Sequence, residues 1–235
     1  GLDVFYQPKV DREGKIVGAE ALLRWFSKKR GFVSPADFIP IAEETGVIHL
    51  LGQWVLARVL NDISNWIEKG YNPVPIAINA TASQFEDFEF IEHFITSVKN
   101  KNIPSRLLEL ELTESGLFTD KNKAIETLSR LRDFGITVAL DDFGTGYSSL
   151  SYLSELPLDV LKIDKAFVDG LHDERNRELV KSIIAISKAM GLANVAEGTE
   201  SQDQVNLLES YGCSLFQGYF FSKPLIKNEF EDWIK

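Results

Sequence analysis

The alternation of apolar and polar stretches along this chain predicts strands that alternate with helices. Short apolar runs, each closed by a polar residue, occupy 74–79, 107–111, 137–141, 159–162, 194–197 and 214–217. Between and before them, helical periodicity is found at 51–68, 88–99, 120–134, 174–190 and 201–211, and a glycine follows four of these stretches. Strands that alternate with helices pair in parallel and have both faces of their sheet covered.

The first part of the chain departs from this rhythm. Two strands are expected at 2–8 and 16–25, and the short turn between them predicts an antiparallel hairpin, because a parallel pair needs a longer crossover. A helix is expected to start at Ser34-Pro-Ala-Asp37 and to end at Gly46. With the six later runs this makes eight strands, which indicates an α/β barrel of the size that 235 residues allow.

The chain shows no linker that would divide it, so one domain over 1–235 is the simplest organisation. Because it opens directly on a strand, we expect a domain excised from a longer protein. The net charge of -10 argues against a partner that is a nucleic-acid polymer. The single cysteine, Cys213, indicates a buried thiol in a reducing cytoplasm, and no leader or apolar span is seen; any membrane anchor would lie outside this chain.

Polar residues follow the predicted strands. In a parallel barrel the carboxyl ends of all strands meet at one face, where active sites are built. A strand that meets water would explain any one such residue, but residues from seven separate runs are difficult to explain in this way. They are Glu20, Asn79, Glu111, Asp141, Lys162, Glu197 and Gln217, with Asp142 beside Asp141.

The chemistry of this set points to divalent cations. Carboxylate and amide oxygens are hard ligands that suit Mg²⁺ or Mn²⁺. Converging carboxylates repel one another, so two ions with one bridging aspartate are expected, an arrangement suited to attack of water on a phosphodiester. Lys162 either holds or activates that water or balances the acids, and both interpretations stay open. The histidines, His49, His93 and His172, fall on helices or their flanks and are expected at the surface.

Several motifs together resemble one family. They are Tyr6-Gln-Pro8, Glu20-Ala-Leu-Leu-Arg-Trp25, Ser34-Pro-Ala-Asp-Phe-Ile39, Ala42-Glu-Glu44, Glu111-Leu-Thr-Glu-Ser115, Asp141-Asp-Phe-Gly-Thr-Gly-Tyr-Ser-Ser-Leu150, Leu161-Lys-Ile-Asp164, Ala196-Glu-Gly198 and Gln217-Gly-Tyr219. In this order and spacing the chain is similar to the EAL-domain phosphodiesterases, which hydrolyse the bacterial messenger cyclic di-GMP to linear pGpG. The resemblance implies a modified (β/α)8 TIM barrel whose first strand is antiparallel, in agreement with the predicted hairpin.

The resemblance also assigns roles. It implies that Lys162 contacts the catalytic water, beside Asp141, Asp142 and Glu197 as catalytic acids. Metal ligands would be Glu20, Asn79, Glu111, Asp141, Asp142 and Glu197, and substrate contacts Gln7, Leu23, Arg24, Glu200 and Gln217. Glu114 resembles the acid that anchors the loop after Asp142. The family links that loop to dimerisation, so a homodimer through the loop and helix after Asp142 is implied, together with an upstream sensor or signalling domain.

Three other interpretations of this chain are a silent receptor, an enolase-type barrel and a purely structural barrel. A catalytically silent receptor for cyclic di-GMP would be favoured by lost metal ligands, but the departures from the family pattern, Ala80-Thr81 and Thr199, remove none. Apart from the resemblance, a barrel of the enolase type would also use carboxylates and a lysine at strand ends, although the Asp141-Asp142 pair favours a second metal. A purely structural barrel would not need the polar set.

Overall fold

The computed structural model describes residues 1–113, 120–144 and 153–235. Within these ranges the strands are β1 Leu2–Asp11, β2 Ile16–Ser27, β3 Gly31–Val33, β4 Ile76–Ala80, β5 Leu108–Thr113, β6 Thr137–Phe143, β7 Val160–Ile163, β8 Ala193–Glu197 and β9 Leu215–Gln217. The helices are α1 Pro35–Glu44, α2 Ile48–Glu68, α3 Ala82–Glu86, α4 Phe88–Asn100, α5 Lys121–Phe134, α7 Lys165–Asp169, α8 Glu174–Ala189, α9 Gln202–Tyr211 and α10 Lys227–Ile234, with 3-10 turns at Ser105–Leu107 and Gly170–His172.

The sheet closes on itself to form the predicted barrel. The strand order is β1-β9-β8-β7-β6-β5-β4-β2-β3, and β1 also pairs with β2. Strand β1 is antiparallel to both of its neighbours, whereas β2 and β4 to β9 pair in parallel in succession. This confirms the α/β barrel with an antiparallel first strand. The short strand β3 pairs only with the far end of β2, so it forms a hairpin outside the ring.

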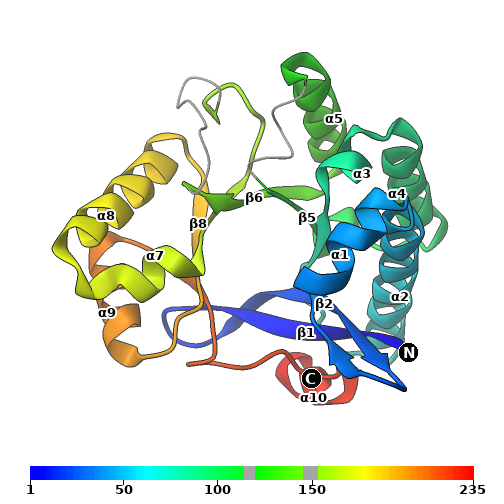
Figure 1. The fold of residues 1–235 in the computed structure, drawn as a ribbon, viewed down its shortest axis with the longest axis horizontal. Helices are drawn as coiled ribbons and strands as arrows, with labels where there is room; N and C mark the ends of the chain where they lie inside the picture. Colours follow the sequence, from blue (N-terminus) through cyan, green and yellow to red (C-terminus); the bar gives the residue numbers. More distant parts are fainter. Residues whose placement is uncertain (114–119, 145–152) are drawn as a thin grey trace.

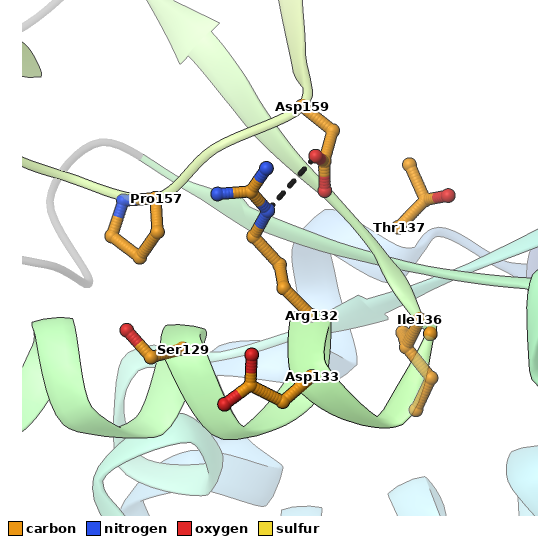
Figure 2. Close-up of a pocket in the computed structure, with 8 residues that line it drawn as sticks. Ser129, Arg132, Asp133, Ile136, Thr137, Pro157 and Asp159 are labelled. Atoms are coloured by element: carbon orange, nitrogen blue, oxygen red, sulfur yellow. Dashed lines mark ion pairs between the residues drawn. The ribbon is translucent and has the colours of Figure 1, made fainter.

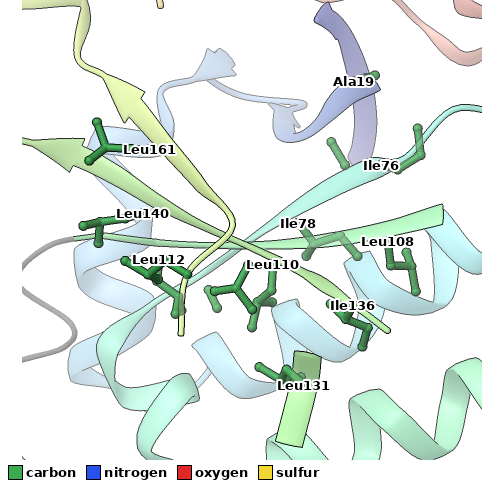
Figure 3. Packing of buried hydrophobic residues seen from close by; sticks show 14 of the residues in the cluster. Ala19, Ile76, Ile78, Leu108, Leu110, Leu112, Leu131, Ile136, Leu140 and Leu161 are labelled. Atoms are coloured by element: carbon green, nitrogen blue, oxygen red, sulfur yellow. The ribbon is translucent and has the colours of Figure 1, made fainter. Parts of the chain in front are cut away.

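The helices surround the barrel (Figure 1), and apolar side chains of the strands pack against them. In β5 the sequence Leu-Glu-Leu-Glu-Leu sends Leu108, Leu110 and Leu112 outward, where they join Leu131 of α5 and Ile136 in one buried cluster (Figure 3). Because side chains alternate along a strand, Glu109 and Glu111 point to the opposite face, into the barrel. The outer layer thus supplies the hydrophobic core, and the inner face can carry polar groups.

The α10 helix completes the core beneath β1. Its Phe230 ring lies 5.2 Å from the ring of Tyr6 in β1 and 5.4 Å from that of Trp66 in α2, measured between centroids. Trp66 and Tyr6 also meet edge to face at 5.3 Å, a geometry that favours aromatic pairs. The polar atoms of these rings have hydrogen-bond partners, since the Tyr6 hydroxyl donates to Asp62 and the Trp66 indole to Glu231.

Within the described ranges, the helices lack an apolar stretch long enough to cross a bilayer.

Some local expectations are corrected. Strand β6 continues through Phe143, two residues beyond the predicted end, and Glu20 lies in the middle of β2 instead of near its end, because β2 runs past the ring to pair with β3. Helix α2 begins at Ile48, earlier than predicted, and α1 ends at Glu44 with Thr45 as its cap, just before Gly46. The short elements β3, α3, α7 and α10 were not predicted.

Candidate active site

Along β6 to β9 the inner face of the barrel is arranged in two layers. Ala139, Val160, Val195 and Leu215 form a small apolar cluster on β6 to β9. Two residues further along the same strands, and therefore on the same face, lie Asp141, Lys162, Glu197 and Gln217. The alternation within each strand thus places an apolar floor below a polar layer, and this polar layer lies at the carboxyl end of the barrel, where active sites of such barrels are built.

Lys162 lies at the centre of the polar layer and is fully buried. Its Nζ lies 2.7 Å from Glu111 Oε2, 2.8 Å from Glu197 Oε1, 3.2 Å from Asp141 Oδ2 and 3.7 Å from Glu20 Oε2. Four carboxylates from four different strands therefore converge on one ammonium group. These contacts keep the lysine charged, because the carboxylates outweigh the cost of burial and raise the pKa of Lys162 well above its usual value.

Amide side chains from β1, β4 and β9 complete this layer around Glu20 of β2. Asn79 Nδ2 donates to Glu20 Oε1 at 2.6 Å, and Gln217 Nε2 donates to Glu20 Oε2 at 2.6 Å and to Gln7 Oε1 at 3.2 Å. Both oxygens of Glu20 are thereby held in place. Among the described residues, the buried Oε1 atom of Gln217 finds no hydrogen-bond partner. A buried acceptor of this kind is rare in proteins unless a ligand, ion or water completes it.

Asp142 reaches the same region by a different route. A regular strand would point Asp141 and Asp142 to opposite faces. Instead, Asp142 has φ 55°, in the left-handed region that few residues other than glycine adopt, and the pairing of β6 with β7 is irregular between Leu140 and Phe143. As a result, one carboxylate oxygen each from Asp141, Asp142 and Glu197 lie within 4.8 Å of one another. Backbone conformations of this kind are concentrated at functional sites.

The protein itself supplies too little positive charge for these acids. Burial, together with Asp141, raises the pKa of Glu197 to about 8 even though Lys162 opposes the shift. Burial and the neighbouring Asp141 raise the pKa of Asp142 to about 6. Burial also acts to raise the pKa of Glu111, but Lys162 and Lys9 outweigh it and lower that pKa to about 2. Of these three acids, Glu111, which has two lysine partners, is the one whose pKa is lowered.

These observations fit a divalent cation. The group formed by Asp141, Asp142 and Glu197 offers three hard oxygen ligands, and Asn79, Glu20 and Glu111 lie beside it. The raised pKa values of Glu197 and Asp142 indicate that a further positive charge would stabilise the ionised carboxylates. The side chains present could therefore hold a metal ion.

A pocket of about 270 Å³ opens beside this cluster. Its walls contain the buried side chains of Gln7 and Gln217, and Glu197 from the metal-binding group. Glu200 lies on its rim, where Lys165 Nζ binds the Glu200 carboxylate at 2.7 Å. Together these contacts bring three of the five predicted substrate-binding residues, Gln7, Glu200 and Gln217, to one cavity.

Leu23 and Arg24 lie instead in a neighbouring, mostly apolar pocket of about 210 Å³, which also contains Asn79. The Arg24 side chain is half-buried, and its Nη1 donates to the Leu23 carbonyl at 3.1 Å. Burial lowers the pKa of Arg24, while Tyr219 and Glu20 act in the opposite direction. Because Asn79 is shared with the carboxylate layer, this pocket adjoins the candidate site.

A pocket of about 440 Å³ lies at the opposite end of the barrel (Figure 2). Thr137 at the start of β6 and Asp159 just before β7 mark it as the amino end of the strands. Arg132 of α5 pairs with Asp159, Nε to Oδ1, at 2.9 Å, and the other Asp159 oxygen accepts a bond from the Val138 backbone nitrogen. The pair balances its own charge, and Asp133, the other acid that lines the pocket, is exposed to solvent. The described lining of this pocket therefore contains no group of buried, converging carboxylates like the one at the carboxyl end.

Several predictions can be compared with the structure. All three histidines lie on helices or turns away from the carboxylate layer, and Cys213 is buried, with a thiol pKa raised to about 12 by burial. Glu114 and most of the loop after Asp142 lie outside the described residues. Lys9 and Glu109, which form ion pairs inside the barrel, were not predicted from the sequence. Their signal was the period-two spacing of Gln7 with Lys9 and of Glu109 with Glu111.

The fold and these residues define the class of protein: an α/β barrel with an acidic, oxygen-rich site at the carboxyl ends of its strands. A model of the EAL domain family matches residues 1–224, and the chain belongs to that family. It is 38% identical, over all of its length, to a cyclic di-GMP phosphodiesterase of Pseudomonas aeruginosa and also 38% identical, again over all of its length, to the cyclic di-GMP phosphodiesterase PdeR of Escherichia coli. The chain spans 40% and 35% of the lengths of these two relatives.

Solved structures agree. The phosphodiesterase MucR in complex with c-di-GMP superimposes with a TM-score of 0.93 at 36% identity, covering 97% of this chain and 94% of that one. The EAL enzyme Bd1971, in a form bound to cAMP and cyclic di-GMP, gives a TM-score of 0.93 at 33% identity and covers all of this chain and 65% of that one. The resemblance identified from the motifs is therefore confirmed.

Proposed function

We propose that this chain is a metal-dependent phosphodiesterase that hydrolyses cyclic di-GMP to linear pGpG. The observation that carries the proposal is the convergence of Glu20, Glu111, Asp141 and Glu197 on Lys162, with Asp142 turned toward the same place. The names of the similar proteins support the substrate, since they include cyclic di-GMP phosphodiesterases and a c-di-GMP complex. A silent receptor remains the second candidate, and the intact ligand set speaks against it.

The proposed cofactors are two Mg²⁺ or Mn²⁺ ions. Glu20, Asn79, Glu111, Asp141, Asp142 and Glu197 would hold them, and Asp141 would bridge the two. When bound, such ions supply Lewis-acid activation of water and of the phosphodiester. The chain's own residues prepare the site: Asn79 and Gln217 fix the Glu20 carboxylate, and Lys162 favours the ionised form of its neighbouring acids and holds them in place. Lys162 would also orient the attacking water, and the neighbouring carboxylates would exchange protons with that water.

The dinucleotide would occupy the two pockets that adjoin the carboxylates. Gln7, Gln217 and Glu200 supply amide and carboxylate groups on one side, and Leu23 and Arg24 supply an apolar surface and a cation on the other. A guanidinium matches the geometry of a phosphate oxygen pair, which fits Arg24 as the phosphate contact. The Gln217 Oε1 acceptor, without a partner among the described residues, would gain a donor from the bound ligand.

The decisive experiment incubates the purified chain with cyclic di-GMP in Mg²⁺ or Mn²⁺, and in parallel with a chelator. The products are separated by ion-exchange chromatography. We expect pGpG to form only in the presence of the metal. Binding of intact cyclic di-GMP without turnover in any metal would support the receptor function instead. If the chain neither binds nor hydrolyses cyclic di-GMP, both functions are refuted.

Two organisational features are proposed with this function. Residues 1–235 would act as one EAL domain of a longer signalling protein, with a sensor or signalling domain upstream. The chain would dimerise through the loop and helix after Asp142, most of which lie outside the described residues. Light scattering coupled to size-exclusion chromatography tests the second point, and a monomer at all concentrations would contradict it.

A further inference from the structure

A second buried lysine lies inside the barrel below the carboxylate layer. Lys9 belongs to β1, is only 5% exposed, and binds two acids of β5. Its Nζ is 2.6 Å from Glu109 Oε1 and 2.6 Å from Glu111 Oε1. Strands β1 and β5 are not neighbours in the sheet, so these contacts cross the interior of the barrel. Charged groups this deeply buried are costly unless they are paired, and here each has a partner.

Glu111 is consequently held from two sides. Its Oε1 accepts from Lys9, and its Oε2 accepts from Lys162 at 2.7 Å. Glu109 lies two residues earlier on the same face of β5. In the part of the chain that the structure describes, its carboxylate forms an ion pair with Lys9 alone. The four side chains form a continuous series, Glu109, Lys9, Glu111 and Lys162, which leads from the interior to the candidate metal site.

The two lysines differ in what they touch. Lys162 contacts several carboxylates of the site, whereas Lys9 touches only Glu111 among them. A buried carboxylate with one oxygen fixed can present the other to a neighbouring group without a loss of side-chain freedom at the time of binding. Without Lys9, the Glu111 side chain could adopt a rotamer that turns both oxygens away from the mouth of the barrel.

We propose that Lys9 is a positioning residue for metal binding: it fixes Glu111 Oε1 so that Oε2 faces the site shared with Lys162. The proposal rests on the proposed metal-dependent function. Glu109 has a separate role, which is to form the second ion pair of the Lys9 ammonium group. Lys9 therefore contributes to metal affinity although it does not touch the substrate pocket of about 270 Å³.

The test compares the K9M/E109Q and E109Q variants with the unmodified chain. The double variant removes the Lys9–Glu109 pair without leaving either charge alone, and methionine keeps the length and shape of the lysine stem. Partners of metal ligands are typically worth 10- to 100-fold in affinity, so we expect the Kd of Mn²⁺ to rise by roughly that factor in the double variant. The matched control E109Q keeps Lys9 and is expected to change the Kd by less than about 3-fold.

Isothermal titration calorimetry with Mn²⁺ alone gives the Kd values, and near-ultraviolet circular dichroism reports the fold. A folded double variant that binds Mn²⁺ as tightly as the unmodified chain would overturn the positioning role. If K9M/E109Q does not fold, K9Q/E109Q replaces it. The glutamine amide keeps a polar group in the interior, but it is shorter than lysine and offers Glu111 no positive charge, so we expect a smaller increase of roughly 3- to 10-fold, and an unchanged Kd overturns the proposal.

The same titration separates this proposal from the proposed function. An unmodified chain that does not bind Mn²⁺ would refute the metal site itself and, with it, the role of Lys9. An unmodified chain that binds Mn²⁺ and hydrolyses cyclic di-GMP, together with an unchanged Kd in the folded double variant, would refute the role of Lys9 alone. Steady-state kinetics add a second readout: the KM for cyclic di-GMP at saturating Mn²⁺ is expected to stay within about 2-fold in the double variant.

Discussion

At the carboxyl end of the barrel four carboxylates surround Lys162, whereas at the amino end Arg132 and Asp159 form a pair that balances its own charge. The amino-end pocket is larger, about 440 Å³ against about 270 Å³. Volume therefore does not single out the functional end. The difference lies in the charges: Glu197 and Asp142 at the carboxyl end have raised pKa values, while the amino-end ion pair is half-exposed and complete.

The largest effect should come from removing one acid at the carboxyl end. D141N takes away the proposed bridging carboxylate and one of the four partners of Lys162. Since even the partners of metal ligands are worth roughly 10- to 100-fold, we expect loss of the ligand itself to lower kcat for cyclic di-GMP by more than about 100-fold. The rate of pGpG formation measures this.

The matched variant at the amino end is D159N, which makes the same chemical change outside the site. It is expected to keep kcat within about 2-fold, because neither Arg132 nor Asp159 contacts the carboxylate layer in the described residues. Far-ultraviolet circular dichroism confirms that both variants fold. Near-normal turnover by D141N would rule out the bridging role, and an equal loss in D159N would mean that the two ends are not independent.

The second prediction concerns pH. Glu197 is an acid whose folded pKa of about 8 exceeds its ordinary value of 4.5, so the folded protein binds this proton more tightly than the unfolded chain. The free energy of unfolding of the metal-free protein should therefore fall as the pH rises from 4.5 through 8. At about 1.4 kcal/mol per pKa unit, the effect reaches a few kcal/mol at most. Glu111, with a pKa of about 2, contributes below this window.

Thermal unfolding in a chelator, followed from about pH 5 to pH 8.5, measures the decrease, and saturating Mg²⁺ should largely remove it, since a bound cation stabilises the ionised acids. The variant E197Q has no titrating carboxyl at this position and should flatten the profile above about pH 6, the pKa of Asp142, whereas D159N should keep it. A Tm that is independent of pH in the chelator would show that Glu197 does not remain protonated in this pH range.

The sequence predicted the ring of strands because most of the predicted strands were followed by a helical pattern. The candidate site residues were predicted from the polar positions at the ends of these strands and from the family motifs. It did not predict that Asp142 adopts φ 55°, since a left-handed residue at a strand irregularity is set by neighbouring strands and not by local preference. It missed α3 and α7 because five residues are too few to show helical periodicity, although the capping box of Thr81 with Gln84 marks the start of α3.

Lys9 was missed for a different reason. The interior of such a barrel is ordinarily filled with branched apolar side chains, so a lysine in β1 suggests an exposed position. Only the closure of the barrel brings Lys9 across to Glu109 and Glu111, which are distant in sequence. Period-two spacing predicts which residues share one face of a strand, but it does not predict whether that face is exposed to solvent or buried.

The smallest effect should come from the amino-end pair. R132A removes a side chain that is 43% exposed, and pairs of this kind contribute about 0–1 kcal/mol, so we expect the free energy of unfolding to fall by no more than about 1 kcal/mol. D159A should cost more, by roughly another 1 kcal/mol, because it also removes the acceptor of the Val138 backbone nitrogen at the start of β6. Urea denaturation separates the two values. If R132A destabilised the protein as much as D159A, the ion pair would contribute more to the free energy of unfolding than the hydrogen bond to the Val138 backbone. The pair at the amino end would then be more than an ordinary, half-exposed ion pair.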